Sequence, residues 1–139
     1  IVEVRSTKTQ AVIGFAGGRA FDLPGAGVTV KTPFVSLILT PLDNLDLVKS
    51  RQILVTALAR DKQTGSIYNA DWSQLTQVGG PPLLLEPVQA TIRLKGIPPR
   101  QVRPLDFYGV PKAKAIALQA DGAFAIDGTH QTFYYEIRR

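Results

Sequence analysis

Hydrophobic and polar residues alternate along most of this chain in short runs with a period of two, which is typical of β-strands that bury one face. Clusters of Gly, Pro, Asn and Asp separate these runs, and no segment shows the 3.6-residue repeat of an amphipathic helix. The pattern predicts an all-β fold, an antiparallel β-sandwich of Ig-like or jelly-roll topology. The expected strands cover residues 1–5, 10–15, 19–23, 28–31, 34–40, 51–60, 83–87, 89–95, 102–108, 112–118, 123–126 and 132–138.

Three segments depart from simple alternation. The run 34–40 is almost continuously apolar, which predicts a central strand buried on both faces. The run 51–60 contains Ala and Leu that would permit a helix, but its β-branched Ile, Val and Thr favour a strand. Residues 61–65 are expected to form a turn. Residues 66–80 are rich in Asn, Asp, Gln and Gly and predict a long irregular loop.

The composition fits one globular domain over residues 1–139, with 45% hydrophobic and 19% charged residues. The absence of cysteine excludes disulfides, thiol catalysis and cysteine-ligated metals, and a single histidine excludes a multi-histidine metal site. No clustered aspartates suggest a calcium site, so we predict no cofactor and no metal. No apolar stretch is long enough to span a membrane. The chain begins at Ile1 without a basic-then-apolar leader, so we expect a piece of a longer or processed protein.

The net charge of +5 raises the question of nucleic-acid binding. The Lys and Arg residues are spread along the whole chain, and no RNP-like string of aromatic and basic residues occurs. Scattered basic residues are typical of the solvent-facing side of strands. We therefore predict no nucleic-acid partner.

Catalytic chemistry has little support in the sequence. His130 is the only imidazole, and we expect it to be a solvated turn residue. Asp71, Glu86 and Asp106 lie in different segments without the frame of a carboxylate pair. Glu86 stands in the apolar run LLLEPV, where we expect an ion pair with an arginine of a neighbouring strand. The sequence thus predicts a protein that is not an enzyme.

Aromatic residues provide the candidate binding site. Tyr68 and Trp72 stand among amides and a carboxylate in the segment 66–80, a combination that suits a sugar because a ring stacks on its C–H face and polar groups bond its hydroxyls. The alternative is that Trp72 only pins a long loop onto the sandwich. On the sandwich itself, Tyr134 is expected to point opposite to its two aromatic neighbours. The candidate ligand-binding residues are Trp72, Tyr68, Asn69, Asp71, Gln74, Tyr108 and Tyr134.

A series of short motifs in a fixed order carries a resemblance to a known group of domains. The sequence resembles the C-terminal β-sandwich domain that follows a (β/α)-barrel in a group of large glycoside hydrolases. The segment between Asn69 and Trp72 is shorter than in that group, which weakens the argument for a ligand site in this loop. The motifs are TKTQAVIGFAGG (7–18), FVSLILTPLD (34–43), SRQILVTA (50–57), QTG (63–65), YNA (68–70), PLLLEPV (82–88), PLDFYGVP (104–111), DGAFAI (121–126) and TFYYEIRR (132–139).

The resemblance implies a non-catalytic role, because the catalytic carboxylates of such enzymes belong to the barrel. It also implies structural roles for Glu86 and Arg51, and secretion of the protein. The first interpretation is a carbohydrate-binding module that holds a polysaccharide or oligosaccharide through exposed aromatics, with a catalytic glycoside hydrolase domain in the full-length protein. The alternative is a structural sandwich that packs on the barrel and has no ligand of its own. An exposed aromatic platform would favour the first, and an exposed aliphatic patch the second.

Overall fold

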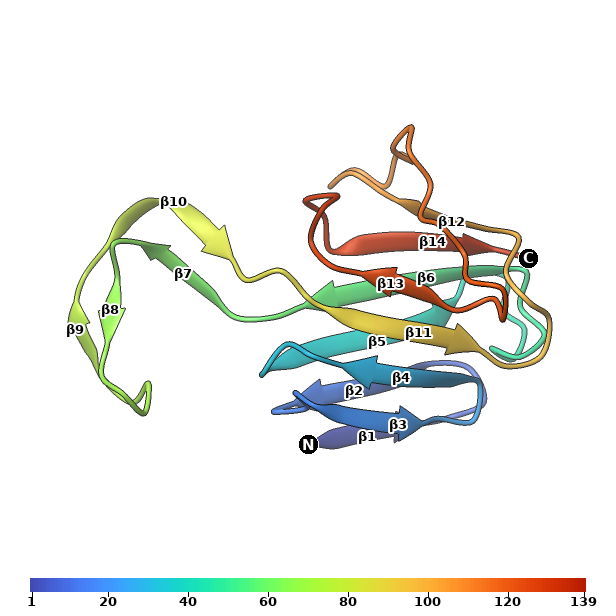
Figure 1. Ribbon diagram of the computed structural model, residues 1–139, viewed down its shortest axis with the longest axis horizontal. Helices are drawn as coiled ribbons and strands as arrows, with labels where there is room; N and C mark the ends of the chain where they lie inside the picture. Colours follow the sequence, from blue (N-terminus) through green and yellow to red (C-terminus); the bar gives the residue numbers. More distant parts are fainter.

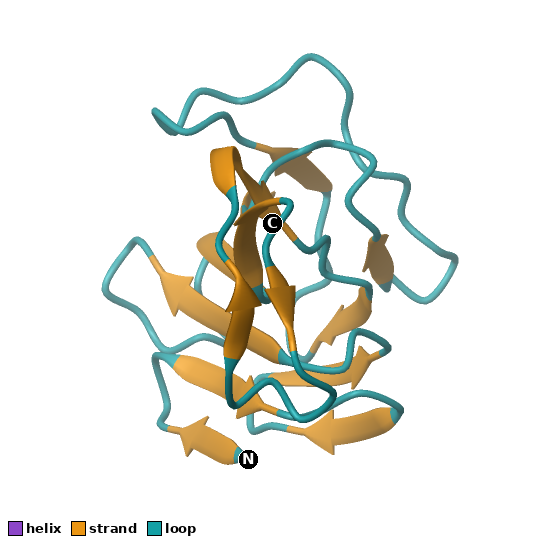
Figure 2. Cartoon of the chain, turned by 90° about the vertical axis from the view of Figure 1, so that its left-hand side faces the viewer, coloured by secondary structure: helices purple, strands orange, loops and turns teal.

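The computed structural model describes all residues 1–139 and contains strands and loops but no helix (Figures 1 and 2). No helix capable of crossing a membrane is therefore present. The all-β prediction is confirmed. The strands are β1 (Val2–Arg5), β2 (Gln10–Gly14), β3 (Arg19–Asp22), β4 (Ala26–Val30), β5 (Val35–Pro41), β6 (Gln52–Leu58), β7 (Asp61–Thr64), β8 (Ile67–Tyr68), β9 (Leu75–Gln77), β10 (Gly80–Leu85), β11 (Ala90–Leu94), β12 (Gln101–Pro104), β13 (Phe124–Ile126) and β14 (Tyr134–Arg138).

Two antiparallel sheets form a sandwich. The larger has the strand order β1-β2-β5-β6-β14-β12, and the smaller has the order β13-β11-β4-β3. The two layers lie one behind the other in Figure 1, where β3 and β4 lie in front of β1 and β2. A cluster of 22 buried residues from both sheets fills the space between them. The predicted antiparallel sandwich is confirmed.

Strand β5 shows how the larger sheet is buried. Val35, Leu37 and Leu39 are fully buried in the sandwich core, whereas Ser36, Ile38 and Thr40 alternate with them and are only half-buried. The prediction that this strand is buried on both faces is therefore wrong. Of these outward-facing residues only Ile38 is hydrophobic, so the run contains one apolar side chain more than the buried face of the strand needs.

The segment 61–85 forms a two-stranded arm that projects from the sandwich (Figure 1). Strand β7 pairs with β10, and β8 pairs with β9 nearer the tip. The predicted turn at 61–65 is therefore wrong, because β7 occupies residues 61–64. The predicted irregular loop at 66–80 is wrong for the paired strands β8 and β9, whereas the residues between them, 69–74, form the turn at the tip. Gly79 allows the two backbones to approach, since an added Cβ would lie 2.3 Å from the Thr64 carbonyl oxygen.

The predicted strand 112–118 is also wrong. This segment makes only isolated bridges to its surroundings, one between Val102 and Ile116 and one between Leu105 and Pro111. The backbone N–H groups of Lys112 and Ile116 bond the carbonyl oxygens of Pro104 and Val102 in β12, but no continuous ladder forms. Ile116 instead packs against the rim of the core as a partly buried side chain.

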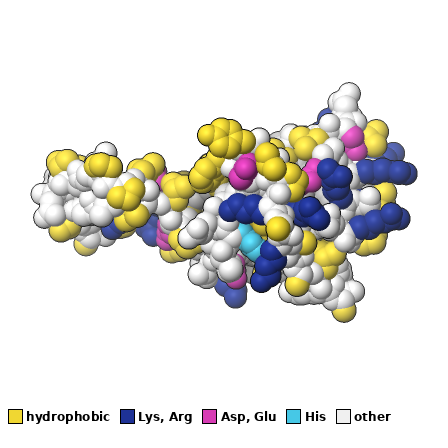
Figure 3. Space-filling model, turned by 90° about the horizontal axis from the view of Figure 1, so that it is seen from above, with side chains coloured by type: hydrophobic (Ala, Val, Ile, Leu, Met, Phe, Trp, Pro, Cys, Tyr) yellow, Lys and Arg dark blue, Asp and Glu magenta, His cyan; other side chains and the backbone are white.

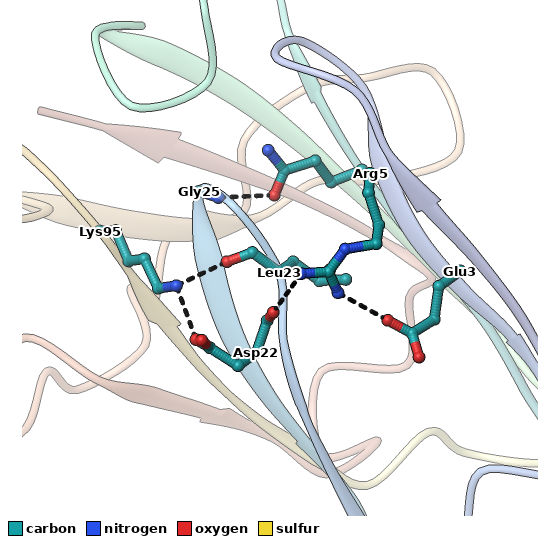
Figure 4. A network of polar contacts seen from close by, with 7 residues as sticks. Glu3, Arg5, Asp22, Leu23, Gly25 and Lys95 are labelled. Atoms are coloured by element: carbon teal, nitrogen blue, oxygen red, sulfur yellow. Dashed lines mark hydrogen bonds and ion pairs between the residues drawn. The ribbon is translucent and has the colours of Figure 1, made fainter.

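Charged side chains close the sandwich at the edge formed by β1 and β3 (Figure 4). The Arg5 guanidinium bonds the Glu3 carboxylate at 2.8 Å and the Asp22 carbonyl at 2.9 Å. The Lys95 ammonium lies 2.6 Å from the Asp22 carboxylate and 2.7 Å from the Leu23 carbonyl. The hydrogen bond from Lys95 is the main cause of the lowered pKa of Asp22. These contacts join one edge strand of each sheet.

Arg139 ties down the opposite end of the sandwich. Its guanidinium donates hydrogen bonds to the carbonyl oxygens of Leu47, Val48, Ser50 and Lys95, at 2.8 to 3.2 Å. The backbone N–H of this arginine also bonds the carbonyl of residue 51 at 3.0 Å. One side chain thus holds the 45–50 loop and the end of β11 to the last strand.

Candidate functional site: the arm and the outer sheet face

The arm tip brings the two predicted aromatic residues together. Tyr68 in β8 and Trp72 in the tip turn stack with ring centroids 4.9 Å apart and an angle of 17° between the rings. The Arg60 guanidinium lies 4.6 Å from the centre of the Trp72 ring. Trp72 is 47% exposed. The indole therefore has two stacking partners from its own chain and still presents part of its surface to solvent.

Two of the predicted hydrogen-bonding side chains of the tip, those of Asn69 and Asp71, are engaged within the turn itself, and Gln74 takes part through its backbone. Asn69 accepts a hydrogen bond from the backbone N–H of Gln74 and donates one to the Ser73 hydroxyl, both at 3.0 Å. Asp71 accepts from the Ser73 hydroxyl at 2.7 Å and from its N–H at 3.1 Å. The Ser73 hydroxyl is the main cause of the lowered pKa of Asp71. These groups stabilise a turn in which Trp72 has a left-handed backbone with φ of 61°.

An ion pair stands at the base of the arm. The Arg60 guanidinium makes two hydrogen bonds to the Glu86 carboxylate, at 2.8 and 3.0 Å. The pair joins the residue before β7 to the residue after β10, so the predicted ion pair of Glu86 with a neighbouring arginine is confirmed. The hydrogen bond from Arg60 lowers the pKa of Glu86, and the same bond raises the pKa of Arg60.

Aliphatic side chains, not aromatic ones, dominate the arm surface. Leu83, Leu84 and Leu85 follow one another along β10 and are 58%, 44% and 47% exposed. Successive strand residues point to opposite faces, so neither face of this ribbon is covered. Figure 3 shows the arm as mainly hydrophobic and uncharged polar surface. Ile67, Leu75 and Val78 add further exposed aliphatic surface.

A cavity of about 450 Å³ lies where the arm meets the sandwich. Leu83–Leu85 form its arm side, and Leu58, Phe107 and Phe133 lie on its sandwich side. The Phe107 and Phe133 rings stack at 5.2 Å. The cavity is therefore an open, largely apolar groove.

The two other predicted tyrosines lie on the sandwich, away from this tip. Tyr108 is 94% exposed in the turn after β12, and its N–H bonds the Asp106 carboxylate. Tyr134 opens β14 on the outer side of the sheet, opposite Thr56, while Tyr135 points into the core. The structure thus gathers five of the seven predicted residues at the arm tip and places two elsewhere.

The outer face of the larger sheet is a feature that sequence reasoning missed. The strand registers place apolar residues of four neighbouring strands on this face in adjacent rows. The one signal in the sequence is Ile38, a hydrophobic residue at an outward-facing position of β5 between the buried Leu37 and Leu39. We call this set of apolar residues the outer patch; it consists of Val2, Val4, Ala11, Ile13, Ile38, Leu54 and Leu58. Val2 and Val4 are exposed, Ala11 is buried, and the other four are half-buried.

Arginines collect at the corner of the same sheet that lies away from the arm. Backbone hydrogen bonds place Arg100 beside Arg138, and Arg51 beside the C-terminal residue. The register of β12 and β14 sets Arg103 opposite Glu136. Figure 3 shows Lys and Arg side chains gathered at the end of the molecule opposite the arm. These four arginines, at positions 51, 100, 103 and 138, are called the arginine corner below.

No three His, Cys, Asp or Glu residues come together to form a metal site. No protein-family model matches the sequence, and neither a curated protein nor a solved structure shows significant similarity to it.

Proposed function

We propose that this chain is a non-catalytic accessory β-sandwich domain that packs on the catalytic (β/α)-barrel of a secreted polysaccharide-degrading enzyme, with the arm lying on that barrel. The observation that carries the proposal is the run of three exposed leucines, Leu83–Leu85, on both faces of an arm that has no core of its own.

The energetics of the arm support a protein partner. An isolated two-stranded ribbon is marginally stable in water. Covering the exposed half of a leucine side chain gains on the order of 1 kcal/mol, so a partner surface under β10 would stabilise the arm by a few such increments. Exposed aliphatic patches of this kind mark protein interfaces. A sugar offers C–H faces to aromatic rings and has no comparable use for a leucine ribbon.

The nature of the partner comes from the sequence. The ordered motifs resemble the accessory sandwich of large glycoside hydrolases, in which a barrel carries the catalytic carboxylates. Ion pairing of Glu86 agrees with the structural role that this resemblance implies for it.

The test compares hydrogen exchange of the arm amides in this chain and in the polypeptide encoded by its complete gene. We expect residues 61–85 to be protected at least tenfold more in the complete polypeptide. The strands β4 and β11 of the smaller sheet serve as the internal control. Equal exchange of the arm in both polypeptides, or a gene that encodes no further domain, would refute the proposal.

Glycan binding is the second candidate, and the exposed part of the Trp72 indole favours it. In this case Trp72 and Tyr68 would stack on a polysaccharide, with Asn69, Asp71 and Gln74 around them. Affinity electrophoresis of the chain against β-glucans, xylans, mannans and acidic glycans tests this candidate. Glycan binding at the arm tip would be established if one glycan retards the chain, Trp72→Ala abolishes this retardation and Tyr108→Ala leaves it unchanged.

A further inference from the structure

We infer that the outer face of the larger sheet is a second docking surface, and that its occupant is a folded protein surface with an apolar centre and carboxylates along one side. The inference deepens the proposed function, since it supplies a second area of contact with a partner domain. It is carried by a different set of residues from the arm.

The apolar part of the face follows from strand register. Val4, Ala11 and Ile38 form one row across β1, β2 and β5, and this row continues to Thr56 and Tyr134. The row beside it contains Val2, Ile13, Ser36 and Leu58. An outward sheet face that only met solvent would carry polar residues at most of these positions. Six of the nine residues in these two rows are aliphatic, a larger share than a face that only meets solvent would carry.

Aromatic rings extend this surface at the end of the sheet near the arm. Phe15 lies two residues after Ile13, and Phe34 lies two residues before Ser36. The two rings make an edge contact with their centroids 5.3 Å apart. Phe15 is 70% exposed. A large exposed ring beside an aliphatic patch is typical of the residues that anchor protein interfaces.

The charged part of the face determines which partner it suits. Glu136 lies on the same face in the next row, beside Leu54, and it accepts hydrogen bonds from Gln52 at 2.5 Å and from Arg138 at 3.2 Å. Arg103 lies opposite this glutamate, but no hydrogen bond reaches its buried Nε. Arg103 and Arg138 share the outward alternation of Glu136, so this part of the face has two guanidinium groups and one carboxylate. Carboxylates on the partner would complete it, since Arg forms directional, charge-assisted pairs with them.

A second copy of this chain fits the face less well. Each copy brings the same excess of arginine and a net charge of +5. Two copies that pair through this face would bring together four guanidinium groups, from Arg103 and Arg138, and only two Glu136 carboxylates, which desolvates charges without pairing all of them. Charge complementarity thus favours a different, acidic partner.

Thiol labelling tests the inference, because the chain has no cysteine of its own. Single variants Val4→Cys and Ile38→Cys report the outer face, Leu84→Cys reports the arm, and Thr29→Cys on the exposed side of β4 is the matched control. A maleimide reagent is applied to each variant in this chain and in the polypeptide encoded by the complete gene. We expect at least tenfold slower labelling at positions 4 and 38 in the complete polypeptide, and no change at position 29.

The charge component has its own test. Adding Arg103→Glu to the Ile38→Cys variant should restore most of the labelling rate in the complete polypeptide, whereas Lys31→Glu on the smaller sheet should not. If neither substitution restores the labelling rate at position 38, the inference that the partner carries carboxylates along one side is overturned.

The outcomes separate this inference from the proposed function. Protection at positions 4 and 38 with a freely labelled position 84 supports the inference and refutes arm docking. Protection at position 84 alone overturns the inference and leaves arm docking intact. If this chain sediments as a dimer and Ile38→Arg dissociates it, a second copy is the occupant and the inference is overturned. The inference is also overturned if the complete gene product is this chain alone, monomeric and freely labelled at position 38.

Discussion

Replacing Glu86 with Gln tests whether one ion pair holds the arm in place. The carboxylate accepts two hydrogen bonds from Arg60, and glutamine keeps only one acceptor while presenting an N–H group to the other donor. Both side chains are partly exposed, at 28% and 32%. A fully buried pair would cost about 3–5 kcal/mol to break and a surface pair about 0–1 kcal/mol, so this pair should contribute about 1–2 kcal/mol.

The measurement is native-state hydrogen exchange of the β7 and β10 ladder amides. A loss of about 1–2 kcal/mol corresponds to roughly 5–30-fold less protection of these amides at pH 7. Trp72 is the only tryptophan, and Arg60 lies against its ring, so its fluorescence should change in the same variant. Glu3→Gln is the matched control, because it breaks the pair with Arg5 at the far edge of the sandwich and should leave arm exchange unaltered.

The pH dependence of the effect follows from the lowered pKa of Glu86. A carboxyl whose folded-state pKa lies below its unfolded value stabilises the fold above the unfolded pKa, and this contribution disappears as the pH falls through the folded pKa. The difference in arm protection between the unsubstituted protein and the Glu86→Gln variant should therefore be full at pH 7 and shrink below about pH 4.5, the ordinary value. A difference in protection under twofold at pH 7, or one that persists unchanged at pH 3, would refute the reasoning.

Three further predictions concern other parts of the structure. Arg139→Met should lower the free energy of unfolding by roughly 2–4 kcal/mol in urea titrations, because four carbonyl oxygens lose a charged donor; a loss under 1 kcal/mol would contradict the clamp. Gly96→Ala should destabilise by at least 1 kcal/mol, since φ is +79° and the new Cβ would meet the Val48 carbonyl at 2.4 Å; an unchanged melting temperature would argue against this backbone. Trp72→Ala should leave sandwich stability within about 0.5 kcal/mol by circular dichroism, because the arm lies outside the core.

The binary pattern alone was sufficient to predict the sandwich and most of its strands. Alternation in β6 and β14 and the punctuation by Gly and Pro are local properties, and they determined strand type correctly even where Ala and Leu permitted a helix. The pairing of Glu86 with an arginine was equally predictable, because a carboxylate in an apolar run needs a partner. The sequence could not name Arg60, since partner choice depends on how two distant segments meet.

Only the tertiary structure decided the arm, the outer face and the surroundings of Trp72. The segment 66–80 has the composition of a loop, yet backbone pairing that is blind to side-chain polarity makes it part of a ribbon. An apolar run such as that of β5 occurs both in strands that are buried on both faces and in strands with one face exposed. Which of the two applies depends on whether a second layer of the fold covers the outer face of the sheet. Local spacing placed aromatics beside amides, whereas the fold stacked the two rings on each other and bonded the Asn69 amide within the turn. Local pattern thus determines which residues form strands, and long-range packing determines which surfaces remain free to bind.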